Sequence, residues 1–203
     1  IGTIVYVIVD NKYFGYIVIS DKIKYDSYEA VKGLKANNVK KLVMLTGDKK
    51  DISKVVSEEL KLDEYHSELL PQDKVKCVEK LMLEKSKDGK LLFVGDGIND
   101  APVIKKATVG VSMGNIGSDA AIEASDVVLM KDNLMKIKEV INISKFTKKK
   151  ITQNIIFALG VKFLVLILSL FGLSTILMAT FADVGVTLLS ILNVLIIFKK
   201  KVY

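Results

Sequence analysis

The sequence predicts an α/β domain built on a Rossmann-type parallel sheet, followed by a two-helix transmembrane hairpin. In residues 1–150 charged and apolar residues are mixed, and short β-branched runs alternate with stretches of helical periodicity. Strands that alternate with helices form a parallel sheet with helices on both faces. In residues 151–198 only two formal charges occur, Lys162 and Asp183. The change in composition marks a domain boundary.

The first element expected is a β-hairpin. Residues 3–9 and 15–20 are rich in β-branched and aromatic side chains, and Asp10, Asn11 and Lys12 between them are typical of a turn. The remaining helices are expected at 27–36, 52–60, 72–85 and 99–106, and the strands at 41–45, 91–94, 109–112 and 126–130. Ligands of such sheets bind beyond the carboxyl ends of the strands, which here are followed by residues 46–48 and 95–97. The candidate chemistry therefore lies on one rim of the sheet.

The apolar block divides at residues 172–175 into two runs, each long enough to cross about 30 Å of hydrocarbon. Lysines at 148–150 and 199–201 bracket the block, which places both ends in the cytoplasm by the positive-inside rule. The helix over 134–150 is expected to continue into the membrane. We therefore predict a multi-pass protein of the cell membrane, with a lipid bilayer around the hairpin and the soluble part in the cytoplasm.

Composition excludes several classes of site. The net charge is +7, but the lysines at 148–150 and 199–201 bracket the apolar block and are better explained as membrane flanks, so no nucleic acid partner is expected. A single cysteine, Cys77, and a single histidine, His66, exclude an internal disulfide and a cysteine- or histidine-rich metal site. No Walker A string occurs. The chain begins inside a strand-like run without a methionine, which indicates a fragment or a trimmed chain.

The rim segment 95–102 reads Gly-Asp-Gly-Ile-Asn-Asp-Ala-Pro and connects a buried strand to a helix. Asp96 and Asp100, four residues apart, can approach one hard cation from the same side, and glycines let the backbone come close to an anion. The Gly-Asp-Gly portion alone would be an ordinary turn followed by a helix cap. The full string resembles the signature of P-type ATPases within the haloacid-dehalogenase-like superfamily.

Other segments agree with this resemblance in order and spacing. Residues 44–48 (Met-Leu-Thr-Gly-Asp) resemble the phosphate-binding and hinge segment of the family, and residues 70–74 (Leu-Pro-Gln-Asp-Lys) resemble the segment that brings a lysine to the phosphate. Residues 114–130 resemble the stretch that follows the Gly-Asp-Gly motif. The resemblance covers nearly the whole chain and implies an ATP-hydrolysing translocase that forms an aspartyl phosphate.

The resemblance also implies roles for the rim residues. Asp96 would bind the Mg²⁺ that bridges the phosphoryl group, Asp100 would support that metal, and Asn99 belongs to the same catalytic segment. Thr46 and the Gly47 amide would hold phosphoryl oxygens, Lys74 would offset charge on the transferred group, and Asp48 would contribute to domain closure over ATP.

Parts of the family pattern do not occur in this sequence. The nucleophilic aspartate of an Asp-Lys-Thr-Gly-Thr string, the dephosphorylation loop and a Cys-Pro-Cys membrane helix are absent. The nucleotide site would lie mostly in a missing upstream part of the pump. We assign residues 1–20 to the end of the nucleotide-binding domain and the return strand, 21–147 to the C-terminal part of the phosphorylation domain, and 148–203 to the last two transmembrane helices. Alone, this chain is not expected to form the phosphoenzyme.

The apolar block carries a second candidate site. Lys162 lies near the middle of its span, where a charge costs at least a few kcal/mol unless it is paired or hydrated. Asn154 and Lys162, and then Asp183 and Asn193, are separated by spacings that resemble the zinc, cadmium and lead subgroup of these pumps. The resemblance implies that Asp183 binds the transported divalent ion, that Lys162 is its counter-charge, and that Asn154 and Asn193 support the site. The implied cargo is zinc, cadmium or lead.

Two other readings stay open at this level. A membrane-anchored phosphatase of the same superfamily would share the aspartate loop and use the hairpin only as an anchor. A non-catalytic remnant or regulatory membrane protein would explain the missing nucleophile. The charges of Lys162 and Asp183 within an apolar hairpin favour the pump, because a simple anchor gains nothing from them.

Overall fold

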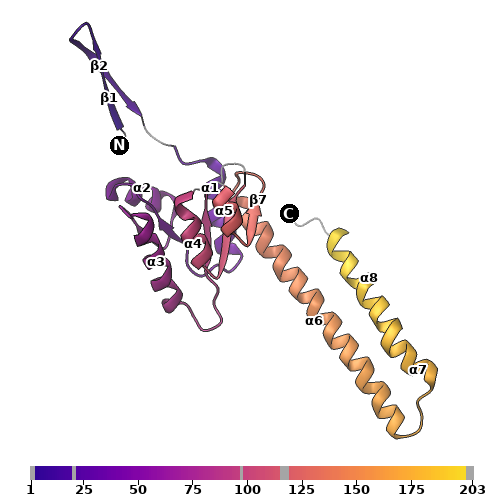
Figure 1. Ribbon diagram of the computed structural model, residues 1–203. Helices are drawn as coiled ribbons and strands as arrows, with labels where there is room; N and C mark the ends of the chain where they lie inside the picture. Colours follow the sequence, from indigo (N-terminus) through magenta and orange to yellow (C-terminus); the bar gives the residue numbers. More distant parts are fainter. Residues whose placement is uncertain (1–2, 20–21, 97, 115–118, 200–203) are drawn as a thin grey trace. The chain divides into compact units, whose positions relative to one another are not determined.

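The computed structural model describes residues 3–19, 22–96, 98–114 and 119–199 (Figure 1). The chain forms two compact units, Ile1–Ile137 and Lys138–Tyr203. Some predictions fall on positions outside the described residues: Ser20 of the second strand, Gly97 of the rim segment, residues 115–118 of the segment after it, and the lysines at 200 and 201.

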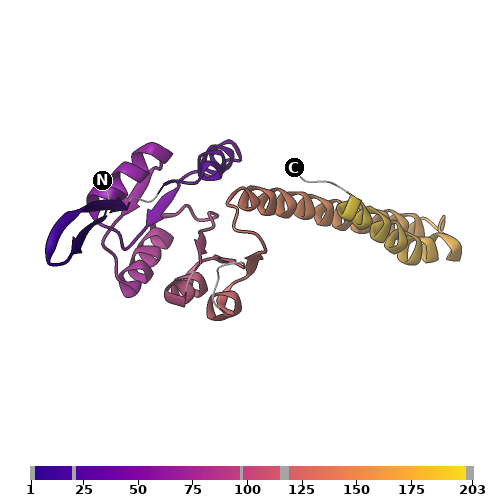
Figure 2. The same cartoon turned by 90° about the horizontal axis from the view of Figure 1, so that it is seen from above.

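The predicted hairpin is confirmed, but its turn is shorter than expected, because Lys12 is already the first residue of the second strand. Strands β1 (Thr3–Val9) and β2 (Lys12–Ile19) pair antiparallel in a two-stranded ribbon (Figure 2). Asp10 and Asn11 adopt left-handed backbone conformations, with φ of 48° and 60°. A two-residue turn with both φ values positive matches the twist of the flanking strands, and Asn and Asp tolerate that conformation better than most residues. The turn residues therefore fix the register next to the turn, and a bulge shifts the register between Val7 and Ile8.

The parallel α/β architecture is also confirmed. Strand β3 (Val43–Leu45) pairs parallel with β4 (Glu64–His66), and β5 (Leu92–Gly95), β6 (Val109–Met113) and β7 (Val127–Leu129) pair parallel in that order. The helices between the strands are α1 (Tyr25–Ala36), α2 (Lys50–Leu60), α3 (Pro71–Glu84), α4 (Ala101–Lys106) and α5 (Asp119–Ala124). A short 3₁₀ turn, Ile98–Asp100, precedes α4. Strand β4 and helix α5 were not predicted.

The core of the first unit lies around α4 and β6. Helix α4 packs against α3, α5 and β6. The fully buried side chains there come from both elements, namely Val103, Ile104, Val111 and Ser112. Burial of the three apolar side chains removes apolar surface from water, which stabilises the fold. The buried hydroxyl of Ser112 shares a 2.9 Å hydrogen bond with the hydroxyl of Ser125. The anchored start of α4 holds the rim segment in place.

Asp63 ties the first half of this unit together. Its carboxylate accepts the Leu42 N–H at 2.8 Å and the Lys35 ammonium at 3.0 Å. The backbone N–H of Leu42, followed by Lys35, lowers the pKa of Asp63 below its ordinary value. A carboxyl whose pKa is lower in the folded state stabilises the fold fully above its ordinary pKa and loses that contribution as the pH falls through the lowered value.

We expect Asp63→Ala to loosen the start of β3, because the Leu42 N–H loses its acceptor, a change of about 1 kcal/mol. Hydrogen exchange measured at neutral pH should show faster exchange of the Leu42 amide than in the unsubstituted chain. The difference should shrink as the pH falls below the ordinary pKa of aspartate. Asp88→Ala, on an exposed turn, serves as the control. Equal exchange in the two variants would contradict this role.

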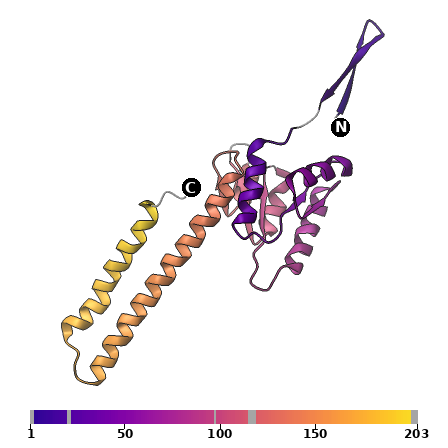
Figure 3. The same ribbon diagram turned by 180° about the vertical axis from the view of Figure 1, so that it is seen from behind.

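The second unit is a helical hairpin. Helix α6 (Met135–Leu170) is followed by α7 (Ile176–Thr180), a π-helical turn (Phe181–Gly185) and α8 (Val186–Lys199), and Figures 1 and 3 show α6 and α8 side by side and antiparallel. Segments Met135–Leu170 and Ile176–Phe198 are long and apolar enough to cross a membrane. They are two candidate transmembrane helices, as predicted. The chain reverses between them, where Gly172 has a φ of 69° that favours glycine.

Candidate functional site

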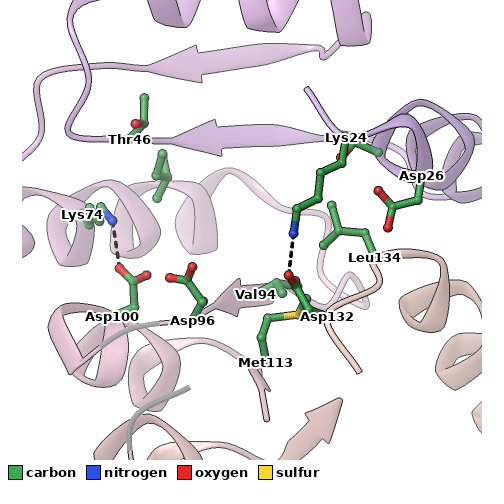
Figure 4. A pocket seen from close by; sticks show the side chains of 13 residues that line it. Lys24, Asp26, Thr46, Lys74, Val94, Asp96, Asp100, Met113, Asp132 and Leu134 are labelled. Atoms are coloured by element: carbon green, nitrogen blue, oxygen red, sulfur yellow. Dashed lines mark hydrogen bonds and ion pairs between the residues drawn. The ribbon is translucent and has the colours of Figure 1, made fainter. Parts of the chain in front are cut away.

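A pocket of about 350 Å³ opens at the carboxyl ends of β3, β5 and β6 (Figure 4). Four of the predicted catalytic residues line it: Thr46, Lys74, Asp96 and Asp100. Gly47, Asp48 and Asn99 are exposed and are not among its lining residues. Nine other residues complete the wall: Lys24, Asp26, Ser27, Leu45, Val94, Gly95, Met113, Asp132 and Leu134.

A largely buried ion pair lies in this pocket. Lys74, in the first turn of α3, approaches Asp100, at the start of α4, with 2.8 Å between Nζ and Oδ1. Only 18% and 12% of the two side chains are exposed. Removing two charges from water is costly, and a close pair with good geometry offsets that cost. Asp96 is exposed and lies beside Asp100 in Figure 4, so an accessible carboxylate lies next to the one that pairs with Lys74.

The loop after β3 is held by its own hydrogen bonds. The Thr46 hydroxyl donates to the Asp48 carboxylate at 2.7 Å, and the Asp48 N–H donates back to the hydroxyl at 3.1 Å. The N–H groups of Glu68 and Leu69 donate to the carbonyls of Asp48 and Thr46 at 2.9 and 3.1 Å. Asp48 therefore orients the Thr46 hydroxyl, and the segment after β4 fixes the loop.

A second ion pair occurs in the helical hairpin. The Lys162 ammonium lies 2.9 Å from Oδ1 of Asp183, which belongs to the π-helical turn. Their side chains are 54% and 74% exposed, in contrast to the pair in the pocket. Asn193 donates to the Asn154 carbonyl oxygen at 2.7 Å, in a separate polar layer of the hairpin. The hairpin thus brings Lys162 to Asp183 and Asn154 to Asn193.

Comparison with known proteins identifies the family. A family model described as haloacid dehalogenase-like hydrolase matches residues 2–108, more than half of the chain. The chain belongs to this family. The match covers strands β3, β4 and β5 and the rim residues Thr46, Lys74, Asp96 and Asp100, and it ends just before β6.

The relatives of this haloacid dehalogenase-like chain include metal-transporting ATPases, which confirms the resemblance seen in the motifs. It is 51% identical over 200 residues to the cadmium, zinc and cobalt-transporting ATPase of Bacillus subtilis (strain 168), covering 98% of the chain and 28% of that protein. It is 51% identical over 192 residues to the zinc-transporting ATPase of Synechocystis sp. (strain ATCC 27184 / PCC 6803 / Kazusa), covering 95% and 26%.

A solved structure agrees. A zinc-transporting PIB-type ATPase in its E2.Pi state matches with a TM-score of 0.85 and 38% identity, over 96% of this chain and 31% of that one. The chain corresponds to the C-terminal region of such pumps. It spans only about a quarter to a third of the length of these relatives.

The haloacid dehalogenase-like pocket contains an ion pair that sequence reasoning missed. Lys24 Nζ lies 2.5 Å from Asp132 Oδ2 (Figure 4), and this hydrogen bond raises the pKa of Lys24. The two residues are 108 positions apart and belong to none of the motifs. The place of Asp132 could have been inferred from the sequence, because it follows strand β7 and the other strands of the sheet also end at the pocket.

The donor set of the pocket fits Mg²⁺. Among the described residues no group of three or more His, Cys, Asp or Glu side chains gathers as a metal cage. Mg²⁺ is usually held by one or two carboxylates, with water and substrate phosphate completing its coordination. Asp96 and Asp100 provide two such hard oxygen donors in one pocket. Thiol and imidazole ligands for a softer metal do not line it.

Gly95 has a packing role in this family motif. A Cβ on Gly95 would lie 2.7 Å from the Asp100 Cβ and 3.0 Å from its Oδ2. Contacts under 3.0 Å between such atoms essentially never occur. The last residue of β5 is therefore glycine so that Asp100 can lie against the backbone and reach Lys74.

We expect Gly95→Ala to displace Asp100 and weaken its ion pair with Lys74, with a loss of about 1–3 kcal/mol from overpacking. Thermal unfolding monitored by circular dichroism should show a lower midpoint than for the unsubstituted chain. Gly15→Ala is a matched control, because nothing lies within 4 Å of a Cβ built there. A Gly95→Ala midpoint equal to that of the control would contradict the packing role.

Proposed function

We propose that this chain is the C-terminal part of an ATP-driven pump that exports a divalent heavy-metal ion, zinc or cadmium, through an aspartyl-phosphate intermediate. Relatives that cover nearly the whole chain are named as transporters of these ions. The observation that carries the proposal is the Lys162–Asp183 pair within an apolar hairpin. A hairpin that only anchored a phosphatase would gain nothing from two charges at that depth.

The rim pocket would bind the phosphoryl group. Lys74 is held at its wall by Asp100, so its ammonium is oriented before a phosphoryl oxygen arrives. The Thr46 hydroxyl, oriented by Asp48, and the Gly47 amide would add hydrogen bonds to the same group. Charge stabilisation by donors oriented in advance is the main contribution a protein makes to phosphoryl transfer.

Asp96 and Asp100 would hold Mg²⁺, which when bound neutralises charge on the phosphoryl oxygens. The accessible Asp96 is the better placed of the two to meet an incoming ion directly, since Asp100 already pairs with Lys74. Asn99 lies between them in the chain and would complete the segment. ATP itself would be bound mostly by an upstream domain.

The sheet offers a place for the missing nucleophile. Among the described strands, β3 pairs only with β4, and β5 pairs only with β6. The pocket lies between the ends of β3 and β5. A parallel strand from an upstream segment could pair with both free edges and bring an aspartate at its carboxyl end into the pocket. We propose that the partner of this chain is that upstream part of the pump.

The hairpin would lie in the cell membrane, with the soluble part in the cytoplasm. Its lysines at 148–150 favour the cytoplasmic side. We keep the domain assignment of residues 1–20 to the end of the nucleotide-binding domain, 21–147 to the phosphorylation domain and 148–203 to the last two transmembrane helices. The large exposed fractions of Lys162 and Asp183 suit a hairpin that packs against further helices.

Asp183 would bind the transported ion, with Lys162 as its counter-charge. In the absence of the ion the pair keeps the site near neutral, which limits the cost of two charges in hydrocarbon. A divalent cation that enters takes the carboxylate from the ammonium. A hard carboxylate combined with soft thiolates from upstream would suit zinc or cadmium. Asn154 and Asn193 would support the site from a separate polar layer of the hairpin, away from the Lys162–Asp183 pair.

We expect Asp96→Asn in the complete pump to abolish phosphoenzyme formation, because the amide cannot hold Mg²⁺ as the carboxylate does. Incorporation of labelled phosphate from ATP measures this step. Metal binding in the membrane should remain largely unchanged. Asp88→Asn, on an exposed turn, is the control. Normal phosphorylation together with lost metal binding would overturn the assignment.

We also expect Asp183→Ala in the complete pump to lose divalent binding and metal-stimulated ATP hydrolysis, whereas Lys162→Ala should retain some binding but disturb release. Equilibrium zinc binding to the purified variants distinguishes the two roles. Thr180→Ala removes a hydroxyl from the same helical segment and serves as the control, since that hydroxyl only donates to the Ile176 carbonyl. Undiminished zinc affinity in Asp183→Ala would remove this residue from the ion site.

A further inference from the structure

The hairpin contains a chain of three hydrogen bonds between α6 and α8. The Lys150 ammonium donates to Oδ1 of Asn193 at 2.7 Å, and Nδ2 of Asn193 donates to Oδ1 of Asn154 at 2.7 Å. Nδ2 of Asn154 then donates to the backbone carbonyl of Ser190 at 3.1 Å. Every bond joins one helix to the other. We call this set of four residues the amide relay.

Chemistry fixes the direction of the amide relay. An ammonium can only donate, so the oxygen of Asn193 must face Lys150. A backbone carbonyl can only accept, so the nitrogen of Asn154 must face Ser190. Both amides are then oriented so that Asn193 donates to Asn154, which is the bond observed. The relay therefore has a single arrangement, which specifies how the two helices meet.

The amide relay and the Lys162–Asp183 pair are separate layers. Asn154 precedes Lys162 by eight residues, or about 12 Å at the helical rise, and Asn193 follows Asp183 by ten residues, or about 15 Å. Both asparagine oxygens already accept a hydrogen bond within the relay. The asparagines thus support the ion pair from a distance and do not lie beside it.

We propose that Lys150 is a positioning residue. Through the amide relay it fixes the position of α8 along α6, and it thereby holds Asp183 within reach of Lys162. The functional meaning of that pair rests on the proposed function. Apolar side chains specify register poorly in lipid, because the solvent is as apolar as they are. A slide of one residue shifts the layers by about 1.5 Å, which would break relay bonds of 2.7 Å.

Lys150 differs from its neighbours in the basic flank. Lys148 and Lys149 are exposed, whereas Lys150 is partly buried, and its ammonium also lies 5.7 Å from the centre of the Phe146 ring. All three lysines contribute equally to a positive cytoplasmic flank. Lys149→Met therefore removes the same charge from the same flank without removing a relay donor, and is the matched control for Lys150→Met.

The register is tested on the 203-residue chain in lipid nanodiscs. With Cys77 replaced by Ser, spin labels at Leu166 and Leu195, both exposed and at different depths along the hairpin, report how far α8 is displaced along α6. We expect Lys150→Met to broaden the distance distribution or to shift it by about one residue rise, roughly 1.5 Å. Lys150→Arg, which keeps a charged donor, should restore the original distribution, and Lys149→Met should leave it unchanged.

The link to the ion site is tested in the complete pump. We expect Lys150→Met to raise the zinc concentration for half-maximal ATPase stimulation by about threefold to tenfold, with a much smaller change in kcat, because a misplaced Asp183 weakens ion binding. Lys149→Met and Lys150→Arg should behave like the unsubstituted pump. A general loss of folding would instead lower kcat in proportion to the protein lost.

The outcomes are distinguishable. An unchanged distance distribution in Lys150→Met overturns the proposal, and so does a shifted distribution with unchanged zinc dependence. If Asp183→Ala keeps full zinc affinity while Lys150→Met still shifts the distances, the proposed ion site fails and the register role of the amide relay stands. A shift in both measurements, reversed by Lys150→Arg, supports the proposal.

Discussion

The ion pair between Lys74 and Asp100 is the constraint on which the rest of the soluble unit depends. Among the described strands, β3 and β4 share no hydrogen bonds with β5, β6 and β7, so side chains must connect the two halves across the pocket. Removing one partner would leave an uncompensated buried charge, a loss of about 3–5 kcal/mol. The pair also explains Gly95, because a side chain there would push Asp100 out of reach of Lys74.

A lysine and an aspartate pair in both candidate sites, and on the proposed function the two pairs work in opposite senses. In the rim pocket the incoming phosphoryl group is an anion, so it competes with Asp100 for the ammonium of Lys74. In the hairpin the incoming metal is a cation, so it competes with Lys162 for the carboxylate of Asp183. Each ion pair is near neutral before the ligand arrives, and each ligand releases one charged partner. The release of one charged partner changes the local contacts of each site, so the empty and loaded states of the site differ.

The sequence predicted the elements whose own residues determine them. Asp10 and Asn11 specify the hairpin turn, and the eight-residue string from Gly95 specifies the rim segment, so both could be inferred locally. Strand β4 could not, because Glu64, Tyr65 and His66 show no apolar strand pattern; they are extended because β3 lies alongside, and Lys41 forms an ion pair with Glu64. The contact of Lys24 with Asp132 joins positions 108 residues apart outside any motif. The local sequence pattern therefore predicts the candidate catalytic residues at the rim of the sheet. Much of the rest of the pocket lining is brought together by tertiary contacts, which the sequence pattern does not show.

The π-helical turn could not be predicted from the hydrophobic periodicity of the sequence either, and it carries Asp183 of the ion-pair layer. The Val186 N–H donates to the Phe181 carbonyl, five residues earlier, and the Thr187 hydroxyl donates to the Asp183 carbonyl at 2.6 Å. A Cβ on Gly185 would lie 2.5 Å from the Phe181 ring, so glycine is required for the ring to pack over this turn. Single π-helical turns occur often at functional sites. Because Asp183 lies inside the turn and Asn193 lies in regular α-helix beyond it, the backbone that carries Asp183, the proposed ion ligand, differs from the backbone that carries the amide relay. The relay can therefore hold the register of the helices while the turn alone sets the direction of Asp183.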